Sequence, residues 1–363
     1  STATSWGYEN TGLVWNNSNG TGSNASLANG DIFGIAYDAD QGIIRFYKNG
    51  TLQNDGYTGI TANDYMPQVS LYHSNSFLVA NFGQDSSFAG NKTAQGKTDA
   101  SGLGDFYYTP PTGYKALCSK NLSPTSIVRP QKHFETLEYT GQNTSSLYNV
   151  TGLEFTPGFA VSTGGNMNNP KNYAAYCWKA GGAAVSNTDG SITSSVSANQ
   201  EAGFSICSWT INTSGVYTIG HGLGKAPDWI MMKNRDTTNN WDCYHSYIGN
   251  TKRFKLNSRD AGEDYTEPWN DTTPTSSVFT STGSWLGGNS NKIIAYCWTS
   301  IPGYSKMGGY TGNGSSDGPF VHLGFRPAWL LLKADLSESW YLYDNKRDVD
   351  NEVNQEFRVD HEY

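Results

Sequence analysis

The C-terminal part of the chain repeats itself, and this repeat limits the folds that the chain can adopt. Leu223–Lys233 (LGKAPDWIMMK) matches Leu323–Lys333 (LGFRPAWLLLK), about one hundred positions later. An earlier, shorter copy aligns through Phe159, which takes the place of Trp229. The string Ala-Tyr-Cys-Trp closes the first copy at 175–178 and the second at 295–298. The repeat therefore predicts two to three related modules, of which the third stops unfinished at Tyr363.

The repeated segments have the character of buried strands. Pro-x-Trp opens a continuously apolar run in the second copy, Trp229–Met232, and an equivalent run in the third. A run that is apolar on both sides favours a strand in a sheet buried on both faces. A buried helix is the alternative, which Pro227 and the glycine-rich approach disfavour.

The composition predicts an all-β protein. Charged residues make up only 15% of the chain, whereas there are 41 glycines and 13% aromatic residues. Gly, Asn and Ser suit turns, and Tyr, Trp, Phe and Thr suit pleated strands. We expect an antiparallel β-sandwich followed by two to three repeated β-sandwich modules.

The first segment predicts short strands separated by turns. We expect strands at Asp31–Asp38, Gly42–Lys48, Met66–Tyr72 and Phe77–Phe82, with a tight reversal at Asn49-Gly50. Strands at this spacing, with turn signals between them, are typical of a sandwich.

The same segment resembles SPRY domains. Four strings carry the resemblance in the order typical of that family, namely Gly30–Asp38, Ile44–Gly50, Tyr65–Leu71 and Ala80–Gln84. The resemblance covers roughly residues 5–120 and implies a concanavalin-like sandwich used for binding. The opening strands of a SPRY domain are not found, so either Ser1 lies inside the domain of a longer protein or those strands come from elsewhere.

The repeated part resembles modules of tailed-phage structural proteins, especially those of marine phages. The strings are Tyr176–Gly182, Ser186–Ile192, Trp269–Phe279 and Gly318–Phe320, within a match from about residue 133 to 348. The resemblance implies a virion protein, assembled in the host cytoplasm and acting outside the cell. Its partners would be other virion proteins and a host cell-surface glycan or receptor. A homo-oligomer is also implied, commonly a trimer in phage appendages.

The domain boundaries follow from these patterns. We expect a SPRY-like sandwich at 1–122, an extended proline-containing connector at 123–132, and repeat modules at 133–202, 203–302 and 303–363.

Charge and cysteine usage exclude several classes of function. The net charge of −8 argues against nucleic acid as a partner, because phosphate binding needs a dense basic surface. The one basic cluster, Lys252, Arg253 and Lys255, is interpreted as a solvated hairpin. No apolar stretch is long enough for membrane insertion. The 5 cysteines contain no Cys-x-x-Cys and indicate reduced, mostly buried thiols.

Neither a cofactor, a metal site nor a catalytic residue is expected. The histidines lack the spacing of zinc ligands, and the glycine-rich stretches, such as Gly308-Gly309 and Gly312–Gly314, are interpreted as turns that no helix follows. Paired carboxylates could serve glycoside hydrolysis, and Glu263–Glu267 is the densest acidic stretch. It lies in a polar insertion, where we expect no burial that would raise the pKa of a carboxyl group for acid catalysis. We therefore do not expect an enzyme.

Aromatic residues provide the candidate binding residues, because sugar rings stack on exposed aromatic side chains. The candidates for glycan contact are Trp6, Tyr8, Trp15, Trp269 and Trp285, all in turn-rich segments. Trp178, Trp229, Trp298 and Trp329 are expected in the core. The alternative is that the first group also packs, between modules or subunits.

These observations lead to the expectation of a phage tail fibre or similar appendage with a role in host recognition. The alternatives are a polysaccharide-degrading tailspike enzyme and a capsid decoration or adhesion protein.

Overall fold

The computed structural model describes residues 6–16, 19–22, 24–54, 56–60, 65, 67–69, 71, 77–121, 126–141, 151–163, 172–315, 318–349 and 353–360. The chain forms two compact units, Ser1–Pro124 and Thr125–Tyr363. Across the described residues, regular structure consists of antiparallel strands and two short 3-10 turns, η1 (Ser119–Asn121) and η2 (Pro130–Lys132). The all-β prediction is confirmed. No helix in this part of the chain has the length and apolar character to cross a membrane.

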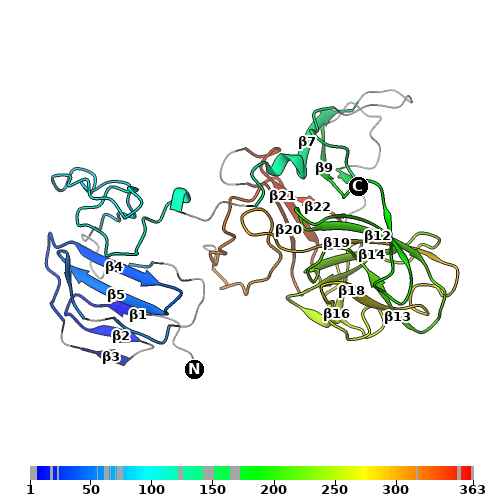
Figure 1. Ribbon diagram of the computed structural model, residues 1–363, viewed down its shortest axis with the longest axis horizontal. Coiled ribbons are helices and arrows are strands. Elements are labelled where there is room, and N and C mark those ends of the chain that lie inside the picture. Colours follow the sequence, from blue (N-terminus) through cyan, green and yellow to red (C-terminus); the bar gives the residue numbers. More distant parts are fainter. Residues whose placement is uncertain are drawn as a thin grey trace. The chain divides into compact units, whose positions relative to one another are not determined.

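The first unit contains two small antiparallel sheets (Figure 1). One has the order β1-β2-β3 and the other β4-β5-β6. Aromatic rings fill the core, where Phe46 is buried and stacks on Phe33 at 5.6 Å between ring centroids. The strands are β1 (Trp6–Tyr8), β2 (Val14–Asn16), β3 (Asn19–Thr21), β4 (Phe33–Asp38), β5 (Ile43–Lys48) and β6 (Thr51–Leu52).

The predicted reversal at Asn49-Gly50 is confirmed. It joins β5 to β6, and Lys48 pairs directly with Thr51. Asn49 and Gly50 have φ angles of 48° and 77°. A two-residue turn with both central φ angles positive matches the twist of the strands, and Asn-Gly adopts it at low cost.

The prediction of a strand at Phe77–Phe82 is wrong. These residues form no strand, and the side chain of Phe77 is 79% exposed. An apolar segment becomes a strand only when a neighbouring strand pairs with it, and none of the described residues pairs with this one. Much of the predicted strand Met66–Tyr72 lies outside the described residues.

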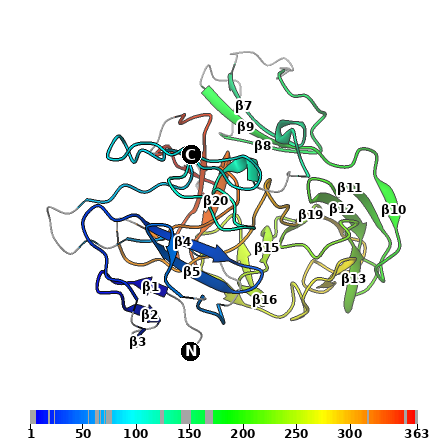
Figure 2. The ribbon, with the colours of Figure 1, turned by 60° about the vertical axis from the view of Figure 1, so that its left-hand side comes forward.

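The second unit contains the repeated part, and its sheets follow the copies. The first copy forms a sheet of order β7-β9-β8, and the third a sheet of order β20-β21-β22. The second copy supplies most of a larger sheet of order β10-β11-β12-β19-β14-β15-β16-β17, and β13 pairs with β18 in a separate layer. Figure 2 shows the first-copy strands above β10, β11 and β12.

The bounds of these strands are β7 (Phe134–Thr140), β8 (Phe159–Ser162), β9 (Asn172–Trp178), β10 (Val185–Asn187), β11 (Ser194–Asn199), β12 (Phe204–Thr210), β13 (Val216–Gly220), β14 (Trp229–Asn234), β15 (Asp242–His245), β16 (Gly249–Lys255), β17 (Glu263–Asp264), β18 (Val278–Thr282), β19 (Lys292–Trp298), β20 (Trp329–Lys333), β21 (Trp340–Asp344) and β22 (Phe357–Arg358).

The first two copies share the same strand pairing. In each, the closing Ala-Tyr-Cys-Trp strand lies between the other two, in the orders β7-β9-β8 and β12-β19-β14. The registers also agree, because Phe159 pairs with Trp178 as Trp229 pairs with Trp298. Equivalent sequence positions therefore occupy equivalent places in the sheets.

One hydrophobic cluster joins all three copies, and we call it the aromatic core. Its buried members include Trp178 of the first copy, Trp229 and Trp298 of the second, and Trp340 of the third. Trp229 and Trp298 stack with their ring centroids 4.4 Å apart. Trp329 is half-buried and meets Trp178 edge-on at 5.4 Å. The prediction of buried tryptophans is confirmed for three positions, and the fourth packs against the same cluster.

The opposite face of the large sheet packs on a second cluster. Val196, Cys207, Ile230 and Cys297 point into it, and the β13–β18 layer covers it. Alternate residues of β12, β14 and β19 thus serve two cores, as expected for strands that are apolar on both sides.

We predict that Trp298→Ala lowers the free energy of unfolding by about 3–5 kcal/mol, the usual cost of truncating a buried tryptophan. Urea unfolding followed by circular dichroism measures this change. The matched control Tyr310→Ala, at a residue 50% exposed, is expected to change it by less than about 0.5 kcal/mol. Equal effects of the two substitutions would show that the aromatic core does not hold the unit together.

Candidate functional site

The three candidates of the first unit lie on its small β1-β2-β3 sheet. Trp6 is half-buried and meets Tyr65 edge-on at 5.9 Å. Tyr8 is also half-buried, and its hydroxyl donates to the carbonyl oxygen of Ala25. Both rings therefore contribute to packing within the unit.

Trp15 is the most accessible of these candidates. It is 39% exposed, and its indole Nε1 donates to Oε2 of Glu9 at 3.0 Å. Trp15 pairs across the strands with Gly20, where an added Cβ would lie 3.1 Å from the indole. The absence of a side chain at Gly20 lets the indole of Trp15 lie flat against the neighbouring strand. The other face of the indole could then stack on a sugar ring.

The prediction that Trp269 is exposed is wrong. Its side chain is only 1% exposed and belongs to the second hydrophobic cluster, where it meets Tyr244 edge-on at 5.7 Å. The turn-rich segment around it folds back, with Asn270 and Asp271 at positive φ. A polar sequence can thus return one large apolar side chain to the core, so Trp269 is removed from the binding candidates.

Trp285 lies in a cluster of ionic and aromatic groups, which we call the Arg253 cluster. The indole of Trp285 donates to Oδ2 of Asp242 at 2.9 Å. The guanidinium of Arg253 lies 4.3 Å from the indole centroid and 4.7 Å from the ring of Tyr265. Two aromatic faces thus cover one cation, and cation–π attraction holds the guanidinium between them.

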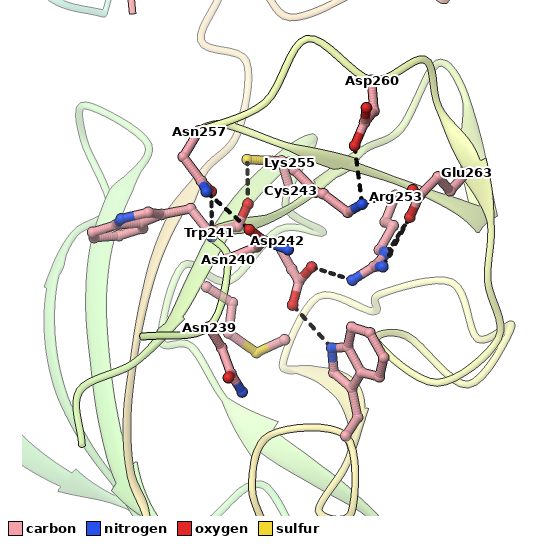
Figure 3. Close-up of polar contacts among 12 residues, drawn as sticks. Asn239, Asn240, Trp241, Asp242, Cys243, Arg253, Lys255, Asn257, Asp260 and Glu263 are labelled. Atoms are coloured by element: carbon pink, nitrogen blue, oxygen red, sulfur yellow. Dashed lines mark hydrogen bonds and ion pairs between the residues drawn. The ribbon is translucent and has the colours of Figure 1, made fainter. Parts of the chain in front are cut away.

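The carboxylates of the Arg253 cluster come from two strands and the loop before β17 (Figure 3). Arg253 on β16 donates to Asp242 on β15 at 2.7 Å and to Glu263 on β17 at 2.8 Å. Lys255 donates to Glu263 at 2.7 Å and to Asp260 at 3.1 Å. Arg253 is only 5% exposed. The interpretation of this basic segment as a solvated hairpin is therefore wrong at Arg253, because its neighbouring acids neutralise it inside the fold.

This arrangement does not suit acid catalysis by Glu263. Partial burial raises the pKa of Glu263, but the donors Lys255 and Arg253 outweigh burial and hold that pKa below its ordinary value. A general acid needs a raised pKa. Burial does raise the pKa of Asp242, yet both its oxygens accept hydrogen bonds from Arg253 and Trp285. The acids of this cluster therefore hold strands together.

Several other titratable side chains lie buried in the described part of the second unit. His221 is fully buried, and its Nε2 lies 3.1 Å from the carbonyl oxygen of Thr275. All five cysteines are free, and every one except Cys118 is buried. Among the described residues, no group of three or more His, Cys, Asp or Glu side chains could hold a metal ion.

A groove in the second unit was not predicted from the sequence. Its volume is about 860 Å³, and it lies where the loop before β8 and the segment after β9 meet strands β11 and β12. Most of its lining residues are small or uncharged, among them Gly181, Ser195, Ser197 and Asn199. Ser, Gly and Asn occur throughout this sequence as turn residues, so their presence in these segments does not indicate a binding site.

Comparison with known families gives two matches. Residues 156–362 match the family described as Domain of unknown function (DUF7483), and residues 1–85 match the SPRY domain. The first match covers more than half of the chain. The chain belongs to the DUF7483 family. The SPRY resemblance is confirmed for residues 1–85, and the groove and the Arg253 cluster both include DUF7483 residues. No curated protein and no solved structure matches the chain.

We predict that Arg253→Met destabilises the DUF7483 region by about 3–5 kcal/mol, because it leaves Asp242 buried without its counter-ion. Lys252→Met is the matched control, because Lys252 lies on the same strand but its partner Asp335 is 46% exposed. The control is expected to cost less than about 1 kcal/mol. Thermal or urea unfolding measures the stability of both variants. If both substitutions lower the free energy of unfolding by a similar small amount, Arg253 does not hold β15, β16 and β17 together.

Proposed function

We propose that this chain is a virion structural protein of a tailed phage, a tail fibre or similar appendage that binds a host-surface glycan. The order of domains supports the proposal, because a SPRY domain precedes the DUF7483 region. The four phage-like strings also support it. One of them, Tyr176–Gly182, begins in the core strand β9 (Asn172–Trp178), and another, Trp269–Phe279, begins at the buried Trp269.

The ion pairs of Glu263 are the observation that favours a glycan-binding appendage over a polysaccharide-degrading enzyme. Glu263 is the acid that a polysaccharide-degrading enzyme would need from the densest acidic stretch. It lies between Arg253 and Lys255 at 2.8 and 2.7 Å, and these cations favour its ionised form. We therefore favour an appendage that recognises a glycan without cutting it.

Exposed apolar side chains support contacts with other virion proteins. In the first unit, Val69, Leu71, Phe77 and Leu78 are between 48% and 79% exposed. Large exposed apolar side chains that lie close in sequence favour association with another polypeptide. The proposed partners are further virion proteins and further copies of this chain, with a homotrimer as the form expected for an appendage.

We predict that mass spectrometry of purified virions detects this protein, and that labelled antibody places it on the tail by electron microscopy. Antibody on the head would favour a capsid decoration protein. Absence of the protein from purified virions would contradict the proposal.

A further inference from the structure

The floor of the groove is built from serine side chains. Strands β11 and β12 pair Ser195 with Ser208 and Ser197 with Ile206. Side chains alternate between the faces of a strand, so the intervening Val196 points into the second hydrophobic cluster. The groove-side residues of β11 and β12 lie on the same sheet face as Phe204, a member of the aromatic core. The groove and the aromatic core thus lie on the same face of the large sheet. This face carries aromatic side chains near Phe204 and serine side chains in the groove.

The walls are fixed to this floor, so the groove is formed before any ligand arrives. Ser197 donates from its hydroxyl to the carbonyl oxygen of Gly182 at 2.7 Å. Asn199 donates to the carbonyl oxygen of Lys179 at 3.1 Å. A Cβ at Gly181 would lie 2.2 Å from the carbonyl oxygen of Ala198, so only glycine allows this close approach. A preformed site avoids the entropic cost of ordering loops on binding.

A buried polar side chain closes one end. His133 is 8% exposed, and its Nδ1 lies 3.1 Å from Nδ2 of Asn199. The Nε2 atom lies 3.8 Å from a carboxylate oxygen of Glu201. Burial lowers the pKa of His133, which favours the neutral ring at pH 7. The ring therefore adds hydrogen-bonding capacity without a charge.

The charges of the lining nearly cancel. Glu154 accepts two hydrogen bonds from Arg129, at 2.6 and 2.7 Å. The remaining charged side chains of the lining are Glu201, 60% exposed, and Lys179, also exposed, one of each sign. A polyanion would need clustered cations, and an apolar ligand would need a mainly apolar lining. The groove mixes the two kinds of surface: hydroxyl, amide and backbone groups lie beside apolar surface from Phe155, Pro157, Ile206 and three alanines. Such a mixed lining suits a sugar, which has polar hydroxyl groups and apolar C–H faces.

We propose that this groove is a binding site for an uncharged oligosaccharide. Its volume of about 860 Å³ falls within the range of about 300–1,000 Å³ for ligand sites. Hydroxyl groups of a sugar both donate and accept hydrogen bonds, as the hydroxyl groups of Ser195 and Ser208 on the floor can. This inference rests on the proposed role in glycan recognition and assigns it to residues other than the five aromatic candidates.

The test uses the full chain on an array of neutral, acidic and amino-bearing oligosaccharides, followed by titration calorimetry with a neutral glycan that binds. Ser195→Trp fills the floor, and Ser208→Trp is a second block at its cross-strand neighbour. Val216→Trp is the control, at a residue 53% exposed on the separate β13–β18 layer. Equal unfolding midpoints show that each variant folds.

We expect neutral glycans to bind, both blocking variants to weaken binding at least about tenfold, and the control to change it less than about twofold. Glu201→Gln is expected to keep neutral-glycan binding. Binding of acidic glycans alone, no binding at all, or unchanged affinity in a folded blocking variant would each overturn this site. Detection of the protein in virions is measured independently of glycan binding. A negative result for the groove would therefore leave the virion proposal standing, and absence from virions would not by itself exclude a glycan site.

Discussion

The stacking of tryptophan side chains from three repeat copies is the interaction on which the second unit depends. Trp229 and Trp298 lie face to face at 4.4 Å, and Trp178 meets both Trp298 and Trp329. A single short sheet buries too little apolar surface to be stable alone. The three copies therefore complete one another, and the link between Tyr176 and Asp344, at 2.8 Å, ties the first copy to the third.

The same arrangement determines where the unit can bind. The large sheet is covered on one face by the β13–β18 layer and on the other by the first and third copies. Toward β10 and β11 the second face changes from aromatic to serine side chains, and the groove begins there. The Arg253 cluster joins β15, β16 and β17 at the far end of the sheet. The ion pairs of the Arg253 cluster stabilise that edge of the sheet. At the other end, the side chains of the groove offer hydrogen-bonding groups to a ligand.

Local patterns in the sequence predicted the all-β fold, the strands of the repeated segments and the buried positions of Trp178, Trp229 and Trp298, because strand propensity depends mainly on neighbouring residues. The turn at Asn49-Gly50 is an example, because its geometry depends on two side chains alone. The same patterns wrongly predicted a strand at Phe77–Phe82, where no strand pairs with the segment. Long-range packing was not predictable. Trp269 lies in the core although its neighbours are polar, and Arg253 is enclosed by acids from β15 and β17. The groove escaped prediction because its lining comes from segments that are far apart in the sequence, between His133 and Ser208.

Hydrogen exchange of the intact chain, followed by mass spectrometry at increasing urea, tests the shared core most directly. Backbone amides of β9, β19 and β20 belong to different copies but to one aromatic core. The account predicts that these three strands lose protection together, at one urea concentration, as a single cooperative unit. Loss of protection in β20 at much lower urea, with β9 and β19 still protected, would contradict it.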